Sequence, residues 1–345
     1  MTNTKVLLIY TGGTIGMNRN PLTGALEPFD FEHLLSKVPE LNLFSIEIAT
    51  YQFQPPIDSS DMSPDFWQKL AQIIIEHYDN YDGFVILHGT DTMAFTASAL
   101  SFMLEGLQKP VILTGSQLPI GQLRTDGKEN LITSIEMAAA RRQDGTARVP
   151  EVCIYFNSHL MRGNRTTKQS ADEFNAFESF NYPHLADAGV QITYHDEYIH
   201  RPLTVHSKFP IQNTQLDSNV IIFSLFPGVR EDIIRHVIVT PGLRSIVMRT
   251  YGSGNAPQSP WLISALKEAY RRGVVVVNIS QCLQGSVMMG RYDTGYQLQE
   301  AGVVSGRDST VEAAVTKLMY LQGRYDDPDI IRRFMNQSIC GEVSI

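Results

Sequence analysis

The first chemical feature of the sequence is a set of threonine hydroxyls that follow short apolar runs. The segment IYTGGTIG, residues 9–16, ends such a run with two glycines between Thr11 and Thr14. A second segment, HGTDTM at residues 88–93, places Asp91 directly after Thr90. A threonine hydroxyl is a weak nucleophile unless a neighbouring base takes its proton. The sequence therefore predicts nucleophilic chemistry at Thr14 or Thr90, provided that the fold supplies a base.

A lysine from a later segment is the candidate base. Lys168 ends NSHLMRGNRTTK, which follows another apolar run. Burial of a lysine disfavours its charged form, so we expect a desolvated Lys168 near Thr90 to act as a base. Backbone N–H groups of the glycine turns are candidate donors to a developing oxyanion.

Each of these residues also has a purely structural interpretation. Thr14 alone is typical of a turn hydroxyl. Asp91 alone is typical of a helix N-cap, with residues 92–93 beginning the helix. Lys168 alone is typical of a solvated surface charge. Single residues do not decide between these interpretations and the chemical ones.

The spacing of the glycines and of the histidines does not favour a phosphate-binding or a metal-binding site. TGGTIG has the form G-G-x-x-G rather than G-x-G-x-x-G, and the pattern G-x-x-x-x-G-K-[ST] does not occur. The nine histidines show no H-x-x-x-H or H-E-x-x-H spacing, and His195 and His200 are five apart. We therefore predict no metal and no other cofactor, and we interpret the glycines as space for a small ligand beside the main chain.

The elements that must position these residues follow from hydrophobic patterning. Short apolar runs alternate with helix-period segments such as residues 63–78 and 257–273, which is typical of parallel sheets covered by helices. The expected strands cover residues 6–10, 84–87, 111–113, 152–156, 220–225, 245–248 and 274–278. Ligands gather outside the carboxyl ends of parallel strands, which is where the polar segments follow.

The chain of 345 residues suits two domains. We predict a larger N-terminal catalytic α/β domain at residues 1–190, with a mostly parallel sheet flanked by helices, and a smaller C-terminal parallel-sheet α/β domain at residues 219–345. Residues 191–218 are polar and without helical period, so they are predicted to form the linker.

The net charge limits which partners the protein can bind, and the cysteine content indicates its cellular compartment. The 28 basic and 36 acidic residues give a formal charge of -8, which opposes nucleic acid and anionic membrane surfaces. The three cysteines are sparse and show no disulfide framework, which favours a reducing cytoplasm. No apolar run is long enough for a signal peptide or a membrane span.

Taken together, the polar segments resemble the bacterial-type L-asparaginase family in order and spacing. The resemblance rests on IYTGGTIG, HGTDTM, TGSQLP, RTDGKENL and RGNRTTK, and it extends through MRTYGSGNAP and VVVVNISQCLQGSVMMGRYDTG. It looks closest to the cytoplasmic type I branch. It implies hydrolysis of L-asparagine to L-aspartate and ammonia, with weak glutaminase activity possible, and a homotetramer built as a dimer of dimers.

The resemblance also implies roles for individual residues. In this family the second threonine of T-G-G-T-I is the usual nucleophile, here Thr14, and it forms a covalent aspartyl ester. Thr90, Asp91 and Lys168 match a second catalytic group, in which Asp91 also pairs with the substrate ammonium. The sequence leaves open which threonine attacks first.

The substrate carboxylate is expected at the segment DSSDM, which matches Ser59 with Ser60 beside it. One departure concerns the loop after the first motif, where the family usually has a tyrosine that polarises the nucleophile. The segment MNRNPLTGALEPFD contains none, and Ala25 stands near its place. The activator then comes from elsewhere in space, from water or from a neighbouring subunit, and residues 18–27 are expected to form a mobile lid.

Members of the type I branch can bind asparagine at a second, regulatory site. The matching residues here are Thr167, Arg249, Asn255 and Cys282. The alternative interpretation of Cys282 is a small buried apolar side chain. Two other functions also stay open: an amino acid sensor that has lost turnover, and a component of a tRNA-dependent amidotransferase that feeds ammonia to a partner.

Overall fold

The computed structural model describes residues 4–19, 26–28, 36–201, 214–290 and 293–344. The chain divides into two compact units, residues 1–211 and 212–345, and each is described by itself. Both units are α/β, and the first contains the larger sheet, so the predicted fold class is confirmed. The limits of the two domains and the linker stay a prediction.

The first unit is built on an eight-stranded sheet with the order β12-β11-β8-β7-β6-β5-β1-β4. The five strands from β4 to β7 in this order are parallel, and β8, β11 and β12 continue the sheet in antiparallel pairs. The strands are β1 (Thr4–Tyr10), β4 (Ile46–Gln52), β5 (Gly83–Leu87), β6 (Val111–Thr114), β7 (Val152–Phe156), β8 (His159–Arg162), β11 (Ala186–Ala188) and β12 (Ile192–Tyr194).

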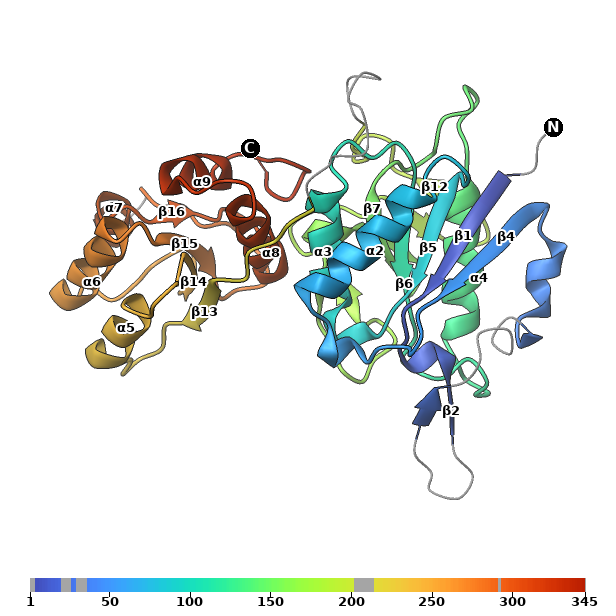
Figure 1. Cartoon of the computed structure of the whole chain (residues 1–345), viewed down its shortest axis with the longest axis horizontal. Coiled ribbons are helices and arrows are strands. Elements are labelled where there is room, and N and C mark those ends of the chain that lie inside the picture. The colour runs from blue at the N-terminus through green and yellow to red at the C-terminus, as the bar shows by residue number, and fades with distance from the viewer. Residues whose placement is uncertain (1–3, 20–25, 29–35, 202–213, 291–292, 345) are drawn as a thin grey trace. The chain divides into compact units, whose positions relative to one another are not determined.

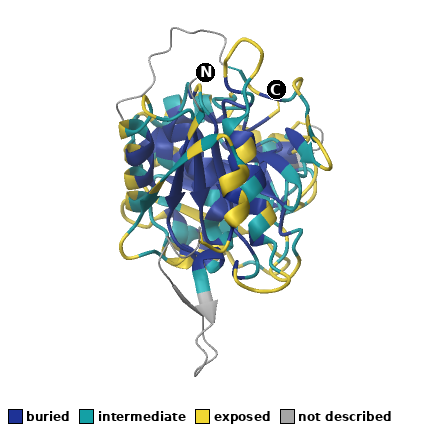
Figure 2. Cartoon of the chain, turned by 90° about the vertical axis from the view of Figure 1, so that its right-hand side faces the viewer, coloured by how far each residue is buried: buried dark blue, intermediate teal, exposed yellow. Residues whose placement is uncertain are grey.

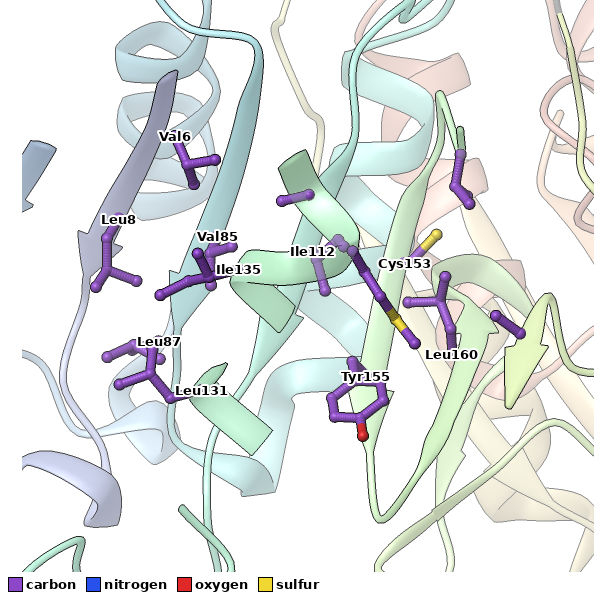
Figure 3. Close-up of a cluster of buried hydrophobic side chains, with 14 of the residues drawn as sticks. Val6, Leu8, Val85, Leu87, Ile112, Leu131, Ile135, Cys153, Tyr155 and Leu160 are labelled. Atoms are coloured by element: carbon purple, nitrogen blue, oxygen red, sulfur yellow. The ribbon is translucent and has the colours of Figure 1, made fainter. Parts of the chain in front are cut away.

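Helices cover both faces of this sheet because its central strands are apolar on both faces. The helices are α2 (Pro64–Glu76), α3 (Met93–Met103) and α4 (Gly127–Ala139). Helices α2 and α3 lie on one face and α4 on the other (Figure 1). On the α4 face, Leu131 and Ile135 lie against Val85 and Leu87 (Figure 3). The central strands of this sheet are buried, while exposed residues lie mainly on the outer sides of helices and on loops (Figure 2).

Short elements connect these layers and carry most of the polar segments. They are the pair β2 (Met17–Arg19) and β3 (Leu26–Pro28), the pair β9 (Thr167–Lys168) and β10 (Phe177–Glu178), and the 3-10 helices η1 (Thr14–Gly16), η2 (Pro39–Leu43), η3 (Ser59–Asp61), η4 (Thr90–Thr92) and η5 (Gly163–Arg165). The pairs β2–β3 and β9–β10 are antiparallel.

The second unit contains a four-stranded parallel sheet with the order β13-β14-β15-β16. The strands are β13 (Val220–Ser224), β14 (Ser245–Thr250), β15 (Val275–Ser280) and β16 (Val304–Ser305), and the helices are α5 (Glu231–Ile238), α6 (Pro260–Arg271), α7 (Asp293–Glu300), α8 (Val311–Gln322) and α9 (Pro328–Met335). Its core joins Ile246 and Val276 of the sheet to Leu262 and Leu266 of α6.

Each strand expected from the sequence is present, with limits that agree to within two residues. Helix α2 begins as predicted, because Ser63 Oγ accepts the Phe66 N–H at 3.4 Å and Pro64 takes the first position. Strand β12 lies within the predicted linker and pairs with β11 in the large sheet. No helix in the described ranges is long and apolar enough to cross a membrane.

Candidate active site

The carboxyl ends of β1 and β5 lie side by side where the connections of the large sheet diverge. Strand β1 leads to β4 on one side, whereas β5 leads to β6 on the other. Open α/β sheets bind ligands in the crevice that such a switch point creates. The turn after β1 is joined to β5 because the Thr11 N–H and hydroxyl both donate to the Leu87 carbonyl, at 3.0 and 2.9 Å. The residues after these two strands are therefore the first candidates for a site.

Two glycines allow the turns after β1, β4 and β5 to touch. Gly13 has φ +96°, and a Cβ there would lie 2.5 Å from the backbone nitrogen of Gly89. A Cβ on Gly89 would lie 2.4 Å from Ser59 Oγ. Only glycine fits at both positions. The glycines thus bring together the turns that carry Thr14, Ser59 and Thr90.

Thr14 is the first residue of η1 and is partly exposed. At the other end of the same turn, the hydroxyl of Tyr10 donates to the Gly16 carbonyl at 3.2 Å. Burial raises the pKa of Tyr10 to about 12, so this tyrosine stays protonated at neutral pH and is a poor base. Tyr10 therefore does not supply a base in place of the tyrosine that the loop lacks.

The two ends of the predicted lid pair in a short antiparallel ladder. Asn18 pairs with Glu27 in the antiparallel ladder between β2 and β3. Residues 20–25, which include Ala25, lie outside the described residues. The place of Ala25 in the loop and the mobility of the lid therefore stay predictions.

Lys168 is brought to the turn after β5 by the pair β9–β10. Its ammonium donates to Thr90 Oγ1 at 2.8 Å and lies 2.7 Å from Asp91 Oδ1. The Lys168 side chain is 19% exposed, whereas that of Asp91 is 67% exposed. Lys168 is thus not a solvated surface charge. Asp91 is not the N-cap of α3, because Thr92 occupies that position.

Gln117 is a contact of Thr90 that the sequence interpretation did not select. The Thr90 hydroxyl donates to Gln117 Oε1 at 3.4 Å, and the Gln117 side-chain amide donates to the carbonyls of Ala171 and Glu173 at 3.2 and 3.0 Å. The Gln117 backbone N–H donates to the Asp126 carboxylate at 3.0 Å. The Thr90 hydroxyl therefore sits between an ammonium donor and an amide acceptor. The segment TGSQLP, which begins at the last residue of β6 and follows the carboxyl end of that strand, was the available signal for Gln117.

Ser59 and Ser60 occupy different environments although they are adjacent. The Ser60 N–H and hydroxyl both donate to Asp58 Oδ1 at 2.8 Å, and these hydrogen bonds lower the pKa of Asp58. Ser60 is exposed, whereas Ser59 is buried and its carbonyl accepts the Thr92 hydroxyl at 2.6 Å. Because its Oγ faces Gly89, Ser59 lies at the junction of the three turns.

His88 supports the turn after β5 from within the core. Its Nδ1 lies 2.6 Å from the Gly89 carbonyl, and its Nε2 lies 2.9 Å from the Thr96 hydroxyl, which also accepts the Trp67 indole N–H. A carbonyl can only accept, so Nδ1 carries the proton and Nε2 accepts from Thr96. Burial lowers the pKa of His88 from 6.5 to about 4, so the ring is neutral at physiological pH.

The depressed pKa of His88 predicts a loss of stability in acid. Between pH 6.5 and about 4 the unfolded chain binds a proton at this histidine and the folded chain does not. The free energy of unfolding therefore falls as the pH falls through this window, by about 3 kcal/mol from His88 alone. Urea unfolding across the window should show this component in the wild type but not in His88→Asn, which keeps a donor near Gly89. Equal pH dependence in both proteins would contradict the assignment.

The four residues expected at a regulatory site lie in different units, and each is described within its own unit. Thr167 pairs with Glu178 in the β9–β10 ladder. Arg249 belongs to β14, and its Nε is buried without a hydrogen-bond partner in the described part of the chain. Asn255 forms a backbone bridge with Tyr251 after the carboxyl end of β14.

Cys282 follows the carboxyl end of β15 and is exposed. The interpretation of this cysteine as a small buried side chain is therefore wrong. Its N–H donates to Ser280 Oγ at 2.9 Å, and the neighbouring Gln281 side chain donates to the carbonyls of Leu225 and Arg249 at 2.6 and 3.0 Å. These contacts join the carboxyl ends of β13, β14 and β15.

Fold and site together define a two-domain α/β protein whose polar groups converge at the carboxyl ends of parallel strands, an arrangement typical of enzymes that act on small molecules. The family model described as asparaginase, N-terminal, matches residues 5–200, and the glutaminase/asparaginase C-terminal domain matches residues 219–335. The chain therefore belongs to the asparaginase family of enzymes.

Individual relatives match over the whole chain. L-asparaginase 1 of Escherichia coli strain K12 is 43% identical over 351 residues, which cover 100% of this chain and 99% of that protein. The crystal structure of L-asparaginase I from Vibrio cholerae superposes with a TM-score of 0.90 at 41% identity, and the match covers 100% of both chains. A glutamyl-tRNA(Gln) amidotransferase component of Pyrococcus abyssi is 32% identical, and the match covers 99% of this chain and 77% of that protein.

Proposed function

We propose that this chain hydrolyses L-asparagine to L-aspartate and ammonia through a threonine nucleophile. The observation that carries the proposal is the contact of Lys168 with both Thr90 and Asp91, beside the turn that holds Thr14. This group supplies a hydroxyl, an amine and a carboxylate within one small region. Family membership and the L-asparaginases among the relatives support asparagine as the substrate.

Charge pairing at both ends of the amino acid fixes its register in the site. Asp91 is 67% exposed, so its carboxylate is accessible to the substrate ammonium. Ser59 lies at the junction of the turns and donates its hydroxyl to the substrate carboxylate, with Ser60 beside it. Holding both ends places the side-chain amide against Thr14 for attack.

The reaction proceeds in two steps through a covalent ester. Thr14 Oγ attacks the amide carbon, the C–N bond breaks, and the threonine proton leaves with the nitrogen as ammonia. Water then attacks the aspartyl ester, which releases L-aspartate and restores the hydroxyl. Lys168, which contacts Thr90 and Asp91, orients Thr90 and takes a proton from Thr90 or from this water, and Asp91 stabilises the ammonium that results. Backbone N–H groups of the glycine turns hold the oxyanion.

The direct test is whether the purified chain releases ammonia and aspartate in equal amounts from L-asparagine, without tRNA or a partner protein. Equal release supports the hydrolase. Release that requires tRNA and a partner would favour the amidotransferase, the alternative that the relative from Pyrococcus abyssi brings forward. Stabilisation by asparagine without any release would favour a sensor. No cofactor takes part in the proposed steps.

We further propose that asparagine acts as an allosteric activator that binds at Arg249, Asn255 and Cys282 of the second unit, and that Thr167 of the first unit takes part in the response. The buried Nε of Arg249, without a hydrogen-bond partner among the described residues, supports a polar ligand near β14. Rate curves in L-asparagine should then be sigmoidal for the wild type and hyperbolic for Arg249→Ala, since the variant lacks the guanidinium that binds the effector. A hyperbolic wild-type curve that Arg249→Ala leaves unchanged would exclude the second site.

The assembly and the compartment follow from the resemblance and the composition. We propose a cytoplasmic homotetramer, a dimer of dimers, with active sites close to subunit contacts. Light scattering of the active protein should give four times the chain mass of 38.6 kDa. A fully active monomer would refute the proposed assembly.

A further inference from the structure

Three histidines gather around one carboxylate at an antiparallel end of the large sheet. Asp187 lies directly opposite His159 in the β8–β11 ladder, so the two side chains share a face. His159 Nδ1 lies 2.7 Å and His184 Nδ1 lies 3.3 Å from Asp187 Oδ1. His195 Nε2 lies 2.8 Å from the other carboxylate oxygen, Oδ2. One carboxylate is therefore contacted by three imidazoles.

The ring of His184 is held from its far side by a second carboxylate. Its Nε2 lies 2.9 Å from Glu178 Oε1, which also accepts the Ser179 N–H at 2.8 Å. A carboxylate can only accept, so Nε2 carries a proton. Histidines that bind metals commonly donate their other N–H to a carboxylate in this way, which fixes the tautomer and the ring orientation. Nδ1 of His184 and of His159 both face Asp187 Oδ1, and binding of an ion there displaces the hydrogens that they donate to this oxygen.

We propose that His159 Nδ1, His184 Nδ1 and Asp187 Oδ1 bind a divalent transition metal ion of the zinc class. One ligand atom from each of these three residues lies within 4.8 Å of those of the other two. Ligand atoms of a tetrahedral zinc site are about 3.3 Å apart, so the His184–Asp187 pair already fits and the His159–Asp187 pair has to open by about half an ångström. Two imidazoles and one carboxylate suit zinc or cobalt better than calcium or magnesium.

The surroundings of the cluster also suit an ion. The rings of His159 and His184 lie 4.2 Å apart between centroids with an interplanar angle of 32°, and the Nδ1 atom of each ring faces Asp187 Oδ1. The three ligand side chains are 24 to 44% exposed, which leaves a path for the ion and room for a water molecule as fourth ligand. His195 and Glu178 orient the ligands without binding the ion. The arrangement that competes with an ion is direct hydrogen bonding of His159 Nδ1 and His184 Nδ1 to Asp187 Oδ1.

The experiment uses the full chain, stripped with a chelator and dialysed. Titration with Co²⁺ followed by visible absorption, and with Zn²⁺ followed by calorimetry, should each show one saturable site per chain. Binding is measured directly, because Glu178 lies opposite Thr167 in the ladder next to Lys168 and activity would not separate the two sites. Thermal unfolding without metal establishes that each variant is folded.

The variants separate a metal site from adventitious binding. His184→Gln and His159→Gln should each weaken Co²⁺ and Zn²⁺ by at least about 100-fold, and Glu178→Gln by about 10- to 100-fold through its effect on ligand orientation. His236→Gln, at an exposed histidine of α5 in the other unit, should bind as the wild type does. Absence of a saturable site, as expected if the histidines only hydrogen-bond to Asp187, would overturn the proposal. Equal affinity in His159→Gln, His184→Gln and the wild type would do the same.

Discussion

Replacing Thr14 with alanine is expected to lower kcat for L-asparagine by about 10⁴-fold. The substitution removes the hydroxyl that forms the acyl-enzyme, and loss of a nucleophile commonly costs this much or more because the other groups cannot act without it. Thr14 is partly exposed on η1, outside the cores of both units, so the fold should persist. Ammonia release under saturating substrate measures the effect.

Two comparisons make the Thr14 result specific. Thr14→Ser keeps a hydroxyl on the same backbone and should retain far more activity than the alanine variant. The melting temperature of Thr14→Ala should match that of the wild type, which separates lost chemistry from lost structure. If folded Thr14→Ala kept turnover within tenfold of the wild type, Thr14 would not be the nucleophile.

Replacing Lys168 with methionine is expected to lower kcat by about 10²- to 10⁴-fold. Methionine keeps a similar length and apolar stem but has no amine to donate to Thr90 or to pair with Asp91. Removal of a positioned acid or base commonly has an effect of this size. KM should change less than kcat if Lys168 acts mainly on the proton of Thr90 or of the attacking water.

The same substitution at Lys5 provides a matched control. Lys5 also pairs with a carboxylate, with Nζ 3.0 Å from Glu47 Oε1, but it lies near the amino end of β1, whereas the candidate site lies at the carboxyl end. Lys5→Met should keep near-normal turnover, because exposed ion pairs contribute little. Near-normal turnover in Lys168→Met as well would contradict the role proposed for Lys168.

The fold could be predicted where strands are long and apolar on both faces. Residues 152–156 form such a strand and were predicted with the observed limits of β7. Strand β4 was missed because it lies at the edge of the sheet, where its residues are only partly buried. Strands β8, β11 and β12 are too short to show a period, and pairing with neighbours defines them.

The site could be predicted only in part, because sequence motifs describe segments and the chemistry depends on how segments meet. The motif around Thr90 was visible, and Lys168 was expected beside it, but Gln117 is identified by its contacts alone. The cluster of His159, His184 and Asp187 has no motif spacing, since strand register brings residues 25 and 28 positions apart together. The periodicity of a single sequence does not reveal which residues strand register brings together.

The measurement that tests the central claim most directly is initial ammonia release by the purified protein across a wide range of L-asparagine, with D-asparagine and L-glutamine in parallel. The proposed site predicts saturable turnover that is selective for L-asparagine, because the ammonium, the carboxylate and the amide must all reach their partners together. Absence of turnover with asparagine-dependent thermal stabilisation would contradict the hydrolase and identify the pocket as that of a sensor.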